Sequence, residues 1–130
     1  MSKGLKLKAD GSCGVKEGTL RRITIVLAQW CPHCVPLSLE KAQKMAEELN
    51  VELRVLDIDK PELTRVADAL VMEQGDFAED YLVPQVFIER DDGSTEHIFT
   101  GFSEGVHVTS ARWDDFFASQ YYRDLVGSAR

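Results

Sequence analysis

The 130-residue chain lacks the long apolar runs that mark membrane and exported proteins. No stretch approaches the roughly 20 apolar residues that a membrane-spanning helix needs. The first eight residues, MSKGLKLK, also lack the apolar core of a secretory signal. On these grounds we expect a cytoplasmic protein with no membrane partner.

The sequence is also poor in basic residues. Its formal net charge is −7 and its pI is about 4.9, which argues against a nucleic-acid partner because such a protein normally presents a basic face. The acidity is uneven, with eight acidic and two basic side chains between positions 57 and 80. This segment is either an ordinary solvated surface or a face that selects basic partner proteins.

Cysteine is scarce as well, with three in the whole chain. An odd number suits a reducing compartment better than a disulfide framework. A structural zinc site needs four ligands, usually as two close pairs. Outside the segment 30–34, which is described below, Cys13, His97 and His107 are the remaining soft ligands and none forms a pair, so we expect no metal. Cys13 is either a plain free thiol or a third redox partner open to glutathione capping.

The pattern of apolar residues predicts one α/β domain at 21–130, preceded by a short polar, glycine-containing extension at 1–20. The expected order is β-α-β-α-β-β-α, with the first two strands parallel and the last two forming an antiparallel hairpin. Pro36 falls near the start of the first helix, where a missing N–H matters least. We expect strands at 21–28, 51–57, 85–89 and 95–100, and helices at about 35–49, at 61–72 and from 109 or 110 onward, with Trp113, Phe116, Phe117 and Tyr121 on the core face of the last helix.

The most informative segment reads Trp30-Cys31-Pro32-His33-Cys34, at the junction of the first strand and the first helix. Two thiols at this spacing and place form a redox pair. The N–H groups and the dipole of a helix start favour negative charge, so Cys31 is expected to be the attacking thiolate and the more exposed sulfur. Cys34, one turn later, is expected to be more buried and to resolve the mixed disulfide.

The other three residues of this pentad are expected to support the two thiols. Pro32 fixes the backbone at the helix start. His33 either tunes the thiols, favouring the Cys31 thiolate when charged, or is an inert solvent-facing ring. Trp30 is either a hydrophobic docking surface over the site or an ordinary core side chain.

The pentad, together with the run Leu82-Val83-Pro84-Gln85-Val86-Phe87-Ile88, resembles the thioredoxin and glutaredoxin superfamily over about residues 21–125. The resemblance implies a thioredoxin-like fold, a central mixed four-stranded sheet flanked by helices. It implies a cis Val83–Pro84 bond beside the cysteines, where the exposed Val83 backbone pairs with an extended substrate. Gly101 stands where glutaredoxins carry a Gly-Gly pair used for glutathione, and we assign it with Val83 and Pro84 to substrate binding.

The resemblance implies a thiol–disulfide oxidoreductase that needs no cofactor beyond its dithiol. We expect a monomer whose partners are disulfide-containing proteins and a recycling reductase or glutathione. The chain has Leu82 where glutaredoxins usually carry Thr, and Ile25 where thioredoxins carry a buried Asp. A glutathione-dependent glutaredoxin, a non-catalytic docking module and a redox sensor are the alternatives.

Overall fold

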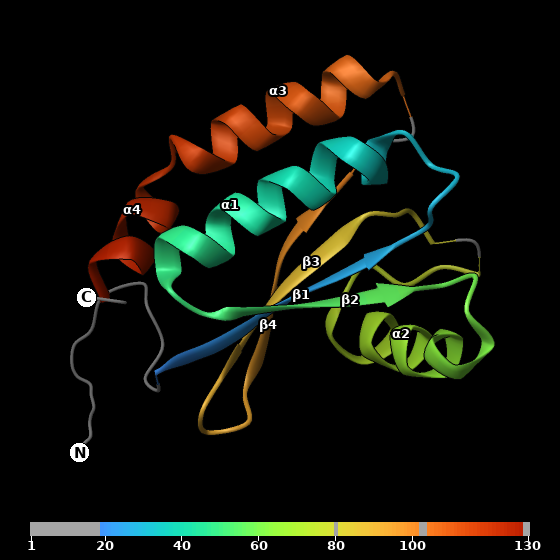
Figure 1. Ribbon diagram of the computed structural model, residues 1–130, viewed down its shortest axis with the longest axis horizontal. Helices are drawn as coiled ribbons and strands as arrows, with labels where there is room; N and C mark the ends of the chain where they lie inside the picture. Colours follow the sequence, from blue (N-terminus) through green and yellow to red (C-terminus); the bar gives the residue numbers. More distant parts are fainter. Residues whose placement is uncertain (1–18, 80, 102–103, 129–130) are drawn as a thin grey trace.

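The computed structural model describes residues 19–79, 81–101 and 104–128 (Figure 1). The predicted N-terminal extension lies almost entirely outside the described residues, and so does Cys13. Leu20, which the sequence assigned to the extension, already belongs to the first strand.

A four-stranded mixed sheet forms the centre of the protein, with strand order β2-β1-β3-β4. The strands are β1 (Leu20–Leu27), β2 (Glu52–Asp57), β3 (Gln85–Arg90) and β4 (Thr95–Thr100). β1 runs parallel to β2 and antiparallel to β3, and β3 and β4 form the predicted antiparallel hairpin. β1 is therefore a central strand. Its C-terminal end lies beside the C-terminal end of β2 and the N-terminal end of β3.

Helices cover the two faces of this sheet unequally (Figure 1). α1 (Leu39–Leu49), α3 (Val106–Phe117) and α4 (Gln120–Ser128) lie on one face, and α2 (Pro61–Gln74) lies on the other. A four-stranded mixed sheet with this order and these layers is the thioredoxin-like α/β fold that the sequence predicts.

Side chains of β1 alternate between two hydrophobic cores, because successive residues of a strand point to opposite faces. Ile23 and Ile25 join the larger core beneath α1, α3 and α4, which also contains the fully buried Trp113. Val26 joins the smaller core beneath α2, with Phe87 of β3. Fully burying an aliphatic or aromatic side chain of this kind contributes about 1.5–3 kcal/mol, so both faces of β1 anchor the fold.

The first predicted helix is interrupted close to its start. Residues His33–Ser38 form an irregular helical segment, η1, and the regular helix α1 begins at Leu39. Val35 is extended (φ −129°, ψ 121°), as expected for a residue before proline, whose α conformation clashes with the Pro36 ring. Both the Val35–Pro36 and the Val83–Pro84 bonds are cis. The expectation of one continuous helix at about 35–49 was therefore wrong at its start. Its predicted end at Leu49 is confirmed, and Asn50, the next residue, has the left-handed conformation.

The last predicted helix is also two helices. It begins at Val106 rather than at Thr109 or Ser110, directly after Gly105, and it ends at Phe117. A second helix, α4, follows because Ser119 caps it: the Ser119 hydroxyl accepts a hydrogen bond from the N–H of Tyr122 at 3.1 Å. The predicted core face is confirmed, with Trp113 buried and the predicted aromatic side chains packed against the core.

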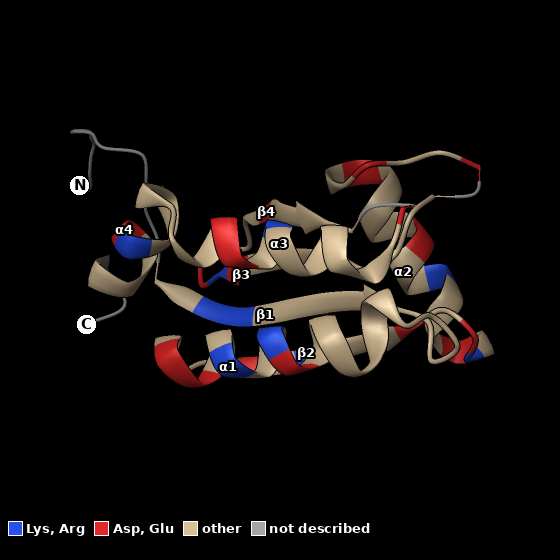
Figure 2. Ribbon diagram, turned by 90° about the horizontal axis from the view of Figure 1, so that it is seen from above, with Lys and Arg blue, Asp and Glu red and all other residues tan. Residues whose placement is uncertain are grey.

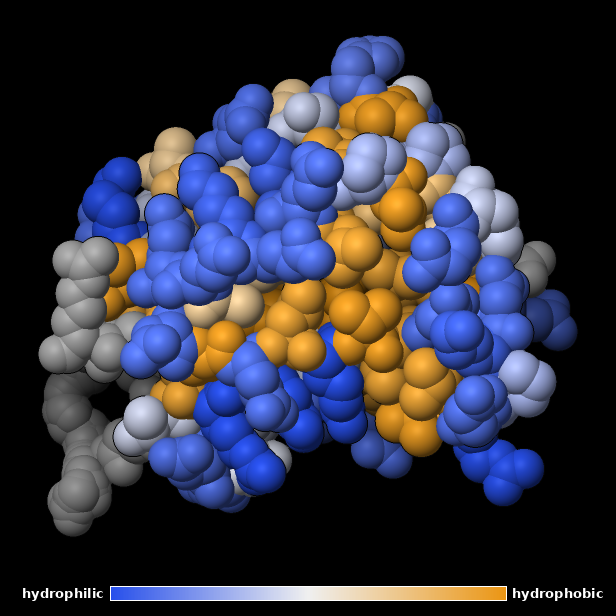
Figure 3. Space-filling view, in the orientation of Figure 1, coloured by the Kyte–Doolittle hydropathy of each residue, from blue (hydrophilic) through white to orange (hydrophobic). Residues whose placement is uncertain are grey.

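Most acidic residues of positions 57–79 are exposed, and Figure 2 shows acidic positions on the ribbon of α2 and the loops beside it. Asp57 is the exception, because it is 97% buried at the end of β2. Apolar side chains gather in a band between α1 and α2 over the edge strand β2 (Figure 3). Within the described ranges, no helix combines the length and apolarity needed to cross a bilayer.

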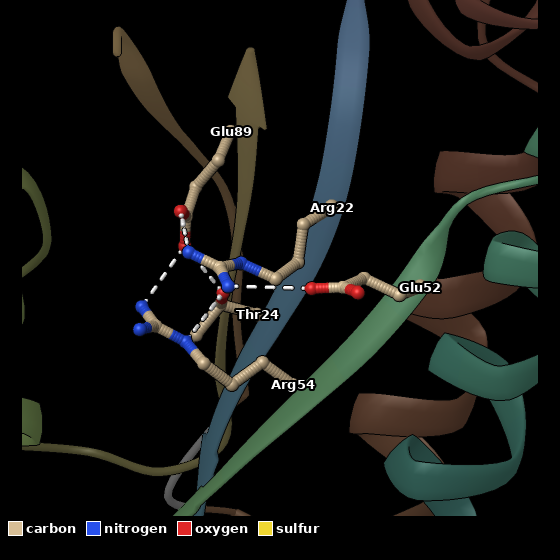
Figure 4. A network of polar contacts seen from close by, with 5 residues as sticks. All are labelled: Arg22, Thr24, Glu52, Arg54 and Glu89. Atoms are coloured by element: carbon tan, nitrogen blue, oxygen red, sulfur yellow. Dashed lines mark hydrogen bonds and ion pairs between the residues drawn. The ribbon is translucent and has the colours of Figure 1, made fainter. Parts of the chain in front are cut away.

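An ion-pair network lies across three strands (Figure 4). Glu89 accepts hydrogen bonds from Arg22 Nη2 at 2.6 Å, from the buried Thr24 hydroxyl at 2.6 Å and from Arg54 Nη2 at 2.9 Å. Arg22 also contacts the exposed Glu52 at 3.3 Å. Burial by itself raises the pKa of Glu89, but the hydrogen bonds from Arg22 and Thr24 and the charge of Arg54 outweigh it and lower that pKa.

We predict that Glu89→Gln lowers the free energy of unfolding at neutral pH by about 1–2 kcal/mol, because Arg54 loses its carboxylate partner and Arg22 keeps only the exposed Glu52. A lowered folded-state pKa means that ionised Glu89 stabilises the fold at pH values above its unfolded pKa of about 4.3. The difference between wild type and variant is therefore lost as the pH falls through the folded-state pKa. Urea unfolding at a series of pH values measures it.

The control for this prediction is Glu52→Gln, which removes the exposed end of the same network. We expect it to change stability by less than about 0.5 kcal/mol. A Glu89→Gln difference that stays constant down to acidic pH contradicts the assigned role of the network.

Candidate functional site: a dithiol at the end of the central strand

Strand pairing brings the two candidate segments of the site together. In the antiparallel register of β1 against β3, Val26 is paired with Gln85, so Pro84 lies beside the turn that follows β1. Cys31 follows β1 within four residues. The structure therefore places the dithiol and the Val83–Pro84 segment at the same edge of the sheet, and the Val83–Pro84 bond has the cis geometry that the resemblance implies.

A tight turn holds the two cysteines next to each other. The N–H groups of Cys34 and Val35 both donate to the Cys31 carbonyl at 3.0 Å, and the Cys31 N–H donates to the Ala28 carbonyl at 3.1 Å. Pro32, at φ −69° and ψ −20°, has the backbone conformation that its ring favours. Both sulfurs are present as free thiols, and Cys31 lies close enough to Cys34 to help raise the pKa of that thiol.

The two thiols differ in their access to solvent. Cys31 is 7% exposed, whereas Cys34 is completely buried, in the order that the sequence predicts. Burial, together with the neighbouring Cys31 and the negative charge of Asp57, raises the pKa of Cys34 to about 12. Cys34 is therefore a thiol that keeps its proton at neutral pH, as suits a sulfur that acts second.

Asp57 is a site residue that the sequence analysis did not single out. It ends β2, it is 97% buried, and it is close enough to Cys34 to raise the pKa of that thiol. Its Oδ1 accepts the N–H of Asp59 at 2.9 Å. The signal was present in the sequence, because the C-terminal ends of two parallel strands meet at one edge of a sheet. Asp57 lies there, beside the turn that follows β1. Ile25 of β1, at the position where thioredoxins carry a buried Asp, has no carboxylate.

His33 is tied to the opposite helix rather than turned toward solvent. Its Nδ1 lies 2.6 Å from the hydroxyl of Thr109, a completely buried residue of α3. The interpretation of His33 as an inert solvent-facing ring is therefore wrong, because the ring is half-buried and held by a partner. Thr109 is a second residue that the sequence analysis did not assign to the site, since it treated this position as the start of a helix.

Trp30 is 69% exposed, which rules out the alternative that it is a core side chain. Leu82, which precedes the Val83–Pro84 segment, is also exposed, at 41%. A large exposed apolar side chain therefore directly precedes Cys31 in the sequence, and another directly precedes the Val83–Pro84 segment.

Gly101 packs directly against Pro84. Its N–H donates to the Pro84 carbonyl at 2.9 Å, and a Cβ added at Gly101 would lie 2.6 Å from Pro84 Cδ. The structure therefore brings Gly101 to the predicted site, where its contact is with the Pro84 segment. Among the described residues, no group of three or more His, Cys, Asp or Glu side chains is arranged to hold a metal ion.

The fold and the site together define a thioredoxin-like domain that carries a dithiol. No protein-family model and no curated protein matches the chain. Among solved structures, the chain is similar to the C-terminal domain of Neisseria meningitidis DsbD in the reduced form. The identity is 20%, the TM-score is 0.40, and the match covers 75% of this chain and 81% of the DsbD domain.

We predict that Gly101→Ala lowers the free energy of unfolding by about 1–3 kcal/mol, because the new methyl group overlaps the Pro84 ring. Urea denaturation measures the change. The matched control is Gly127→Ala on α4, where an added Cβ has nothing within 4 Å. Alanine there also replaces a flexible helical glycine, so this substitution is not expected to lower the free energy of unfolding. Equal effects of the two substitutions would contradict the close packing of Gly101 on Pro84.

We predict that Asp57→Asn lowers the pKa of Cys34, because it removes a negative charge that opposes ionisation of the thiol. Burial is the largest cause of the raised pKa, so the value stays above that of a free cysteine. Thiolate absorbance followed against pH, in Cys31→Ser and in Cys31→Ser/Asp57→Asn, both with Cys13 also replaced by serine so that no third thiol titrates, isolates the Cys34 titration. An unchanged or higher pKa in the double variant would show that the Asp57 charge does not reach this sulfur.

Proposed function

We propose that the protein is a thiol–disulfide oxidoreductase that exchanges disulfides with other proteins. The observation that carries the proposal is the pairing of a slightly exposed thiol, Cys31, with a buried thiol of raised pKa, Cys34, beside the Pro84 segment. A pair that served only packing would not need two sulfurs in such unequal surroundings next to an edge of the sheet.

The exchange follows from this inequality. The Cys31 thiolate attacks one sulfur of a substrate disulfide, a mixed disulfide forms, and the second substrate sulfur leaves as a thiolate. Cys34 then loses its proton and attacks the Cys31 sulfur, which releases the first substrate sulfur and forms the Cys31–Cys34 disulfide. Asp57 is the nearby buried carboxylate to which we assign acceptance of the Cys34 proton. Two electrons pass from the dithiol to the substrate disulfide, and the reverse sequence oxidises a substrate dithiol.

The surroundings of the dithiol favour an extended polypeptide as the substrate. Within the described part of the chain, the Val83 backbone forms no hydrogen bond, so it remains available to pair with a substrate strand. The exposed Trp30 and Leu82 provide apolar contact area on the two sides of the site. We assign the exchange to the cytoplasm, with a reductase or glutathione returning the pair to the dithiol form and with the protein acting as a monomer.

Cys34→Ser tests the proposal, because it removes the sulfur that resolves the mixed disulfide. We predict that this variant accumulates covalent adducts with native, disulfide-bonded insulin or other disulfide-containing proteins, while its turnover in insulin reduction falls about a hundredfold or more. Non-reducing gel electrophoresis and mass spectrometry identify adducts linked through Cys31.

The matched control is Cys31→Ser, which is expected to form no such adducts because Cys34 is buried. If Cys34→Ser forms no adducts and the wild type does not reduce insulin, the non-catalytic docking module becomes the better account. If the wild type is oxidised once without turnover, a redox sensor becomes the better account.

A further inference from the structure

A side-chain hydrogen bond joins the dithiol motif to a helix far away in the sequence. His33 Nδ1 lies 2.6 Å from Thr109 Oγ1, across 76 positions of the chain. His33 is half-buried and Thr109 is completely buried, so water does not compete freely for this contact. A hydrogen bond in such surroundings fixes the orientation of the imidazole more firmly than an exposed one would.

The helix that carries Thr109 is itself held rigidly against the motif. One turn beyond Thr109, Trp113 Nε1 donates to the hydroxyl of Ser38 at 2.8 Å, and both residues are completely buried. The Trp113 ring stacks on Phe99 of β4 with centroids 4.0 Å apart. Two side-chain hydrogen bonds therefore connect α3 to the segment that follows Cys31, and Thr109 reaches His33 from a fixed position.

We propose that Thr109 is a positioning residue, which holds the His33 imidazole and thereby sets the redox equilibrium of the Cys31–Cys34 pair. This inference rests on the proposed function. Thr109 does not touch the sulfurs in this account; it acts through His33, the residue between the two cysteines.

The direction of the effect follows from the two nitrogens of the ring. Thr109 occupies Nδ1, so Nε2 is the nitrogen that remains to act on a thiolate. In a charged ring, Thr109 accepts the Nδ1 proton and Nε2–H is free to donate. In a neutral ring, a hydroxyl that donates to Nδ1 places the single proton on Nε2. In these two arrangements Nε2 carries a proton that a thiolate can accept, whereas a neutral ring protonated on Nδ1 would donate to Thr109 and leave Nε2 without one. The proposal takes the two arrangements with an Nε2 proton, which stabilises the reduced form and makes the disulfide a stronger oxidant.

The test is Thr109→Val, which keeps the branched shape of threonine and removes its hydroxyl. The wild type and the variant are equilibrated with glutathione buffers, in which the dithiol and oxidised glutathione give the Cys31–Cys34 disulfide and two reduced glutathiones. We expect the equilibrium constant for disulfide formation to rise about threefold to tenfold in Thr109→Val; tenfold corresponds to about 30 mV. Thr109→Ser, which keeps the hydroxyl, is expected to stay within twofold of the wild type.

A double-mutant cycle separates positioning of His33 from a general structural role. In a His33→Ala background, Thr109→Val is expected to leave the equilibrium constant unchanged within twofold. Ser38→Ala is the matched control, since it breaks the other hydrogen bond from α3 without touching the imidazole. We expect Ser38→Ala to lower thermal stability while the equilibrium constant stays within twofold. Thr109→Ala, which also lacks the hydroxyl, replaces Thr109→Val if the valine variant does not fold.

Two results overturn the inference while leaving the proposed function intact. One is an equilibrium constant that does not respond to loss of the Thr109 hydroxyl. The other is an equal response with and without His33, because Thr109 would then act by another route. A wild-type protein that forms no Cys31–Cys34 disulfide at any glutathione ratio would overturn the proposed function itself.

Discussion

The position of β1 as a central strand is the constraint on which the rest of the structure depends. β1 pairs in parallel with β2 and in antiparallel with β3, so its C-terminal end meets the end of one neighbour and the start of the other. Three segments that lie far apart in the sequence consequently converge there: the cysteine turn, the buried Asp57 and the Pro84 segment. The two cores on either face of β1 hold this strand in place, and their packing determines where the site residues lie.

The site obtains its chemistry from unequal burial of two identical side chains. Cys31 keeps a small exposed fraction of 7%, while Cys34 is completely buried, and burial together with the charge of Asp57 raises the pKa of Cys34. In the exchange that we propose, this inequality sets an order of events: Cys31 reacts with the substrate first, and Cys34 reacts only once it has been deprotonated. In the proposal made above, α3 adds a second influence, because Thr109 holds the imidazole of His33, the residue before Cys34, through a hydrogen bond that no local feature of the motif supplies.

The sequence predicts the strands, their order and the cysteine pair well, because hydrophobic periodicity and motif spacing are local signals. It also predicts which sulfur is more buried. It does not predict the interruption of the first helix, since the effect of Pro36 on Val35 depends on where in the first turn the proline falls. The parallel pairing of the first two strands does indicate that Asp57 ends at the edge that carries the cysteine turn. That Asp57 meets Cys34, and that Thr109 meets His33, depends on tertiary packing, because nothing within a few positions of either residue indicates it. The split of the last helix had a local signal in Ser119, which the run of aromatic residues obscured.

The most direct test of the central claim is a redox titration of the wild-type protein in glutathione buffers, with the free thiols alkylated and mapped by mass spectrometry. The account predicts one two-electron transition in which Cys31 and Cys34 lose their thiols together and form a disulfide with each other. The account is contradicted if Cys31 and Cys34 remain alkylated at every ratio, or if each of them forms a glutathione adduct independently of the other.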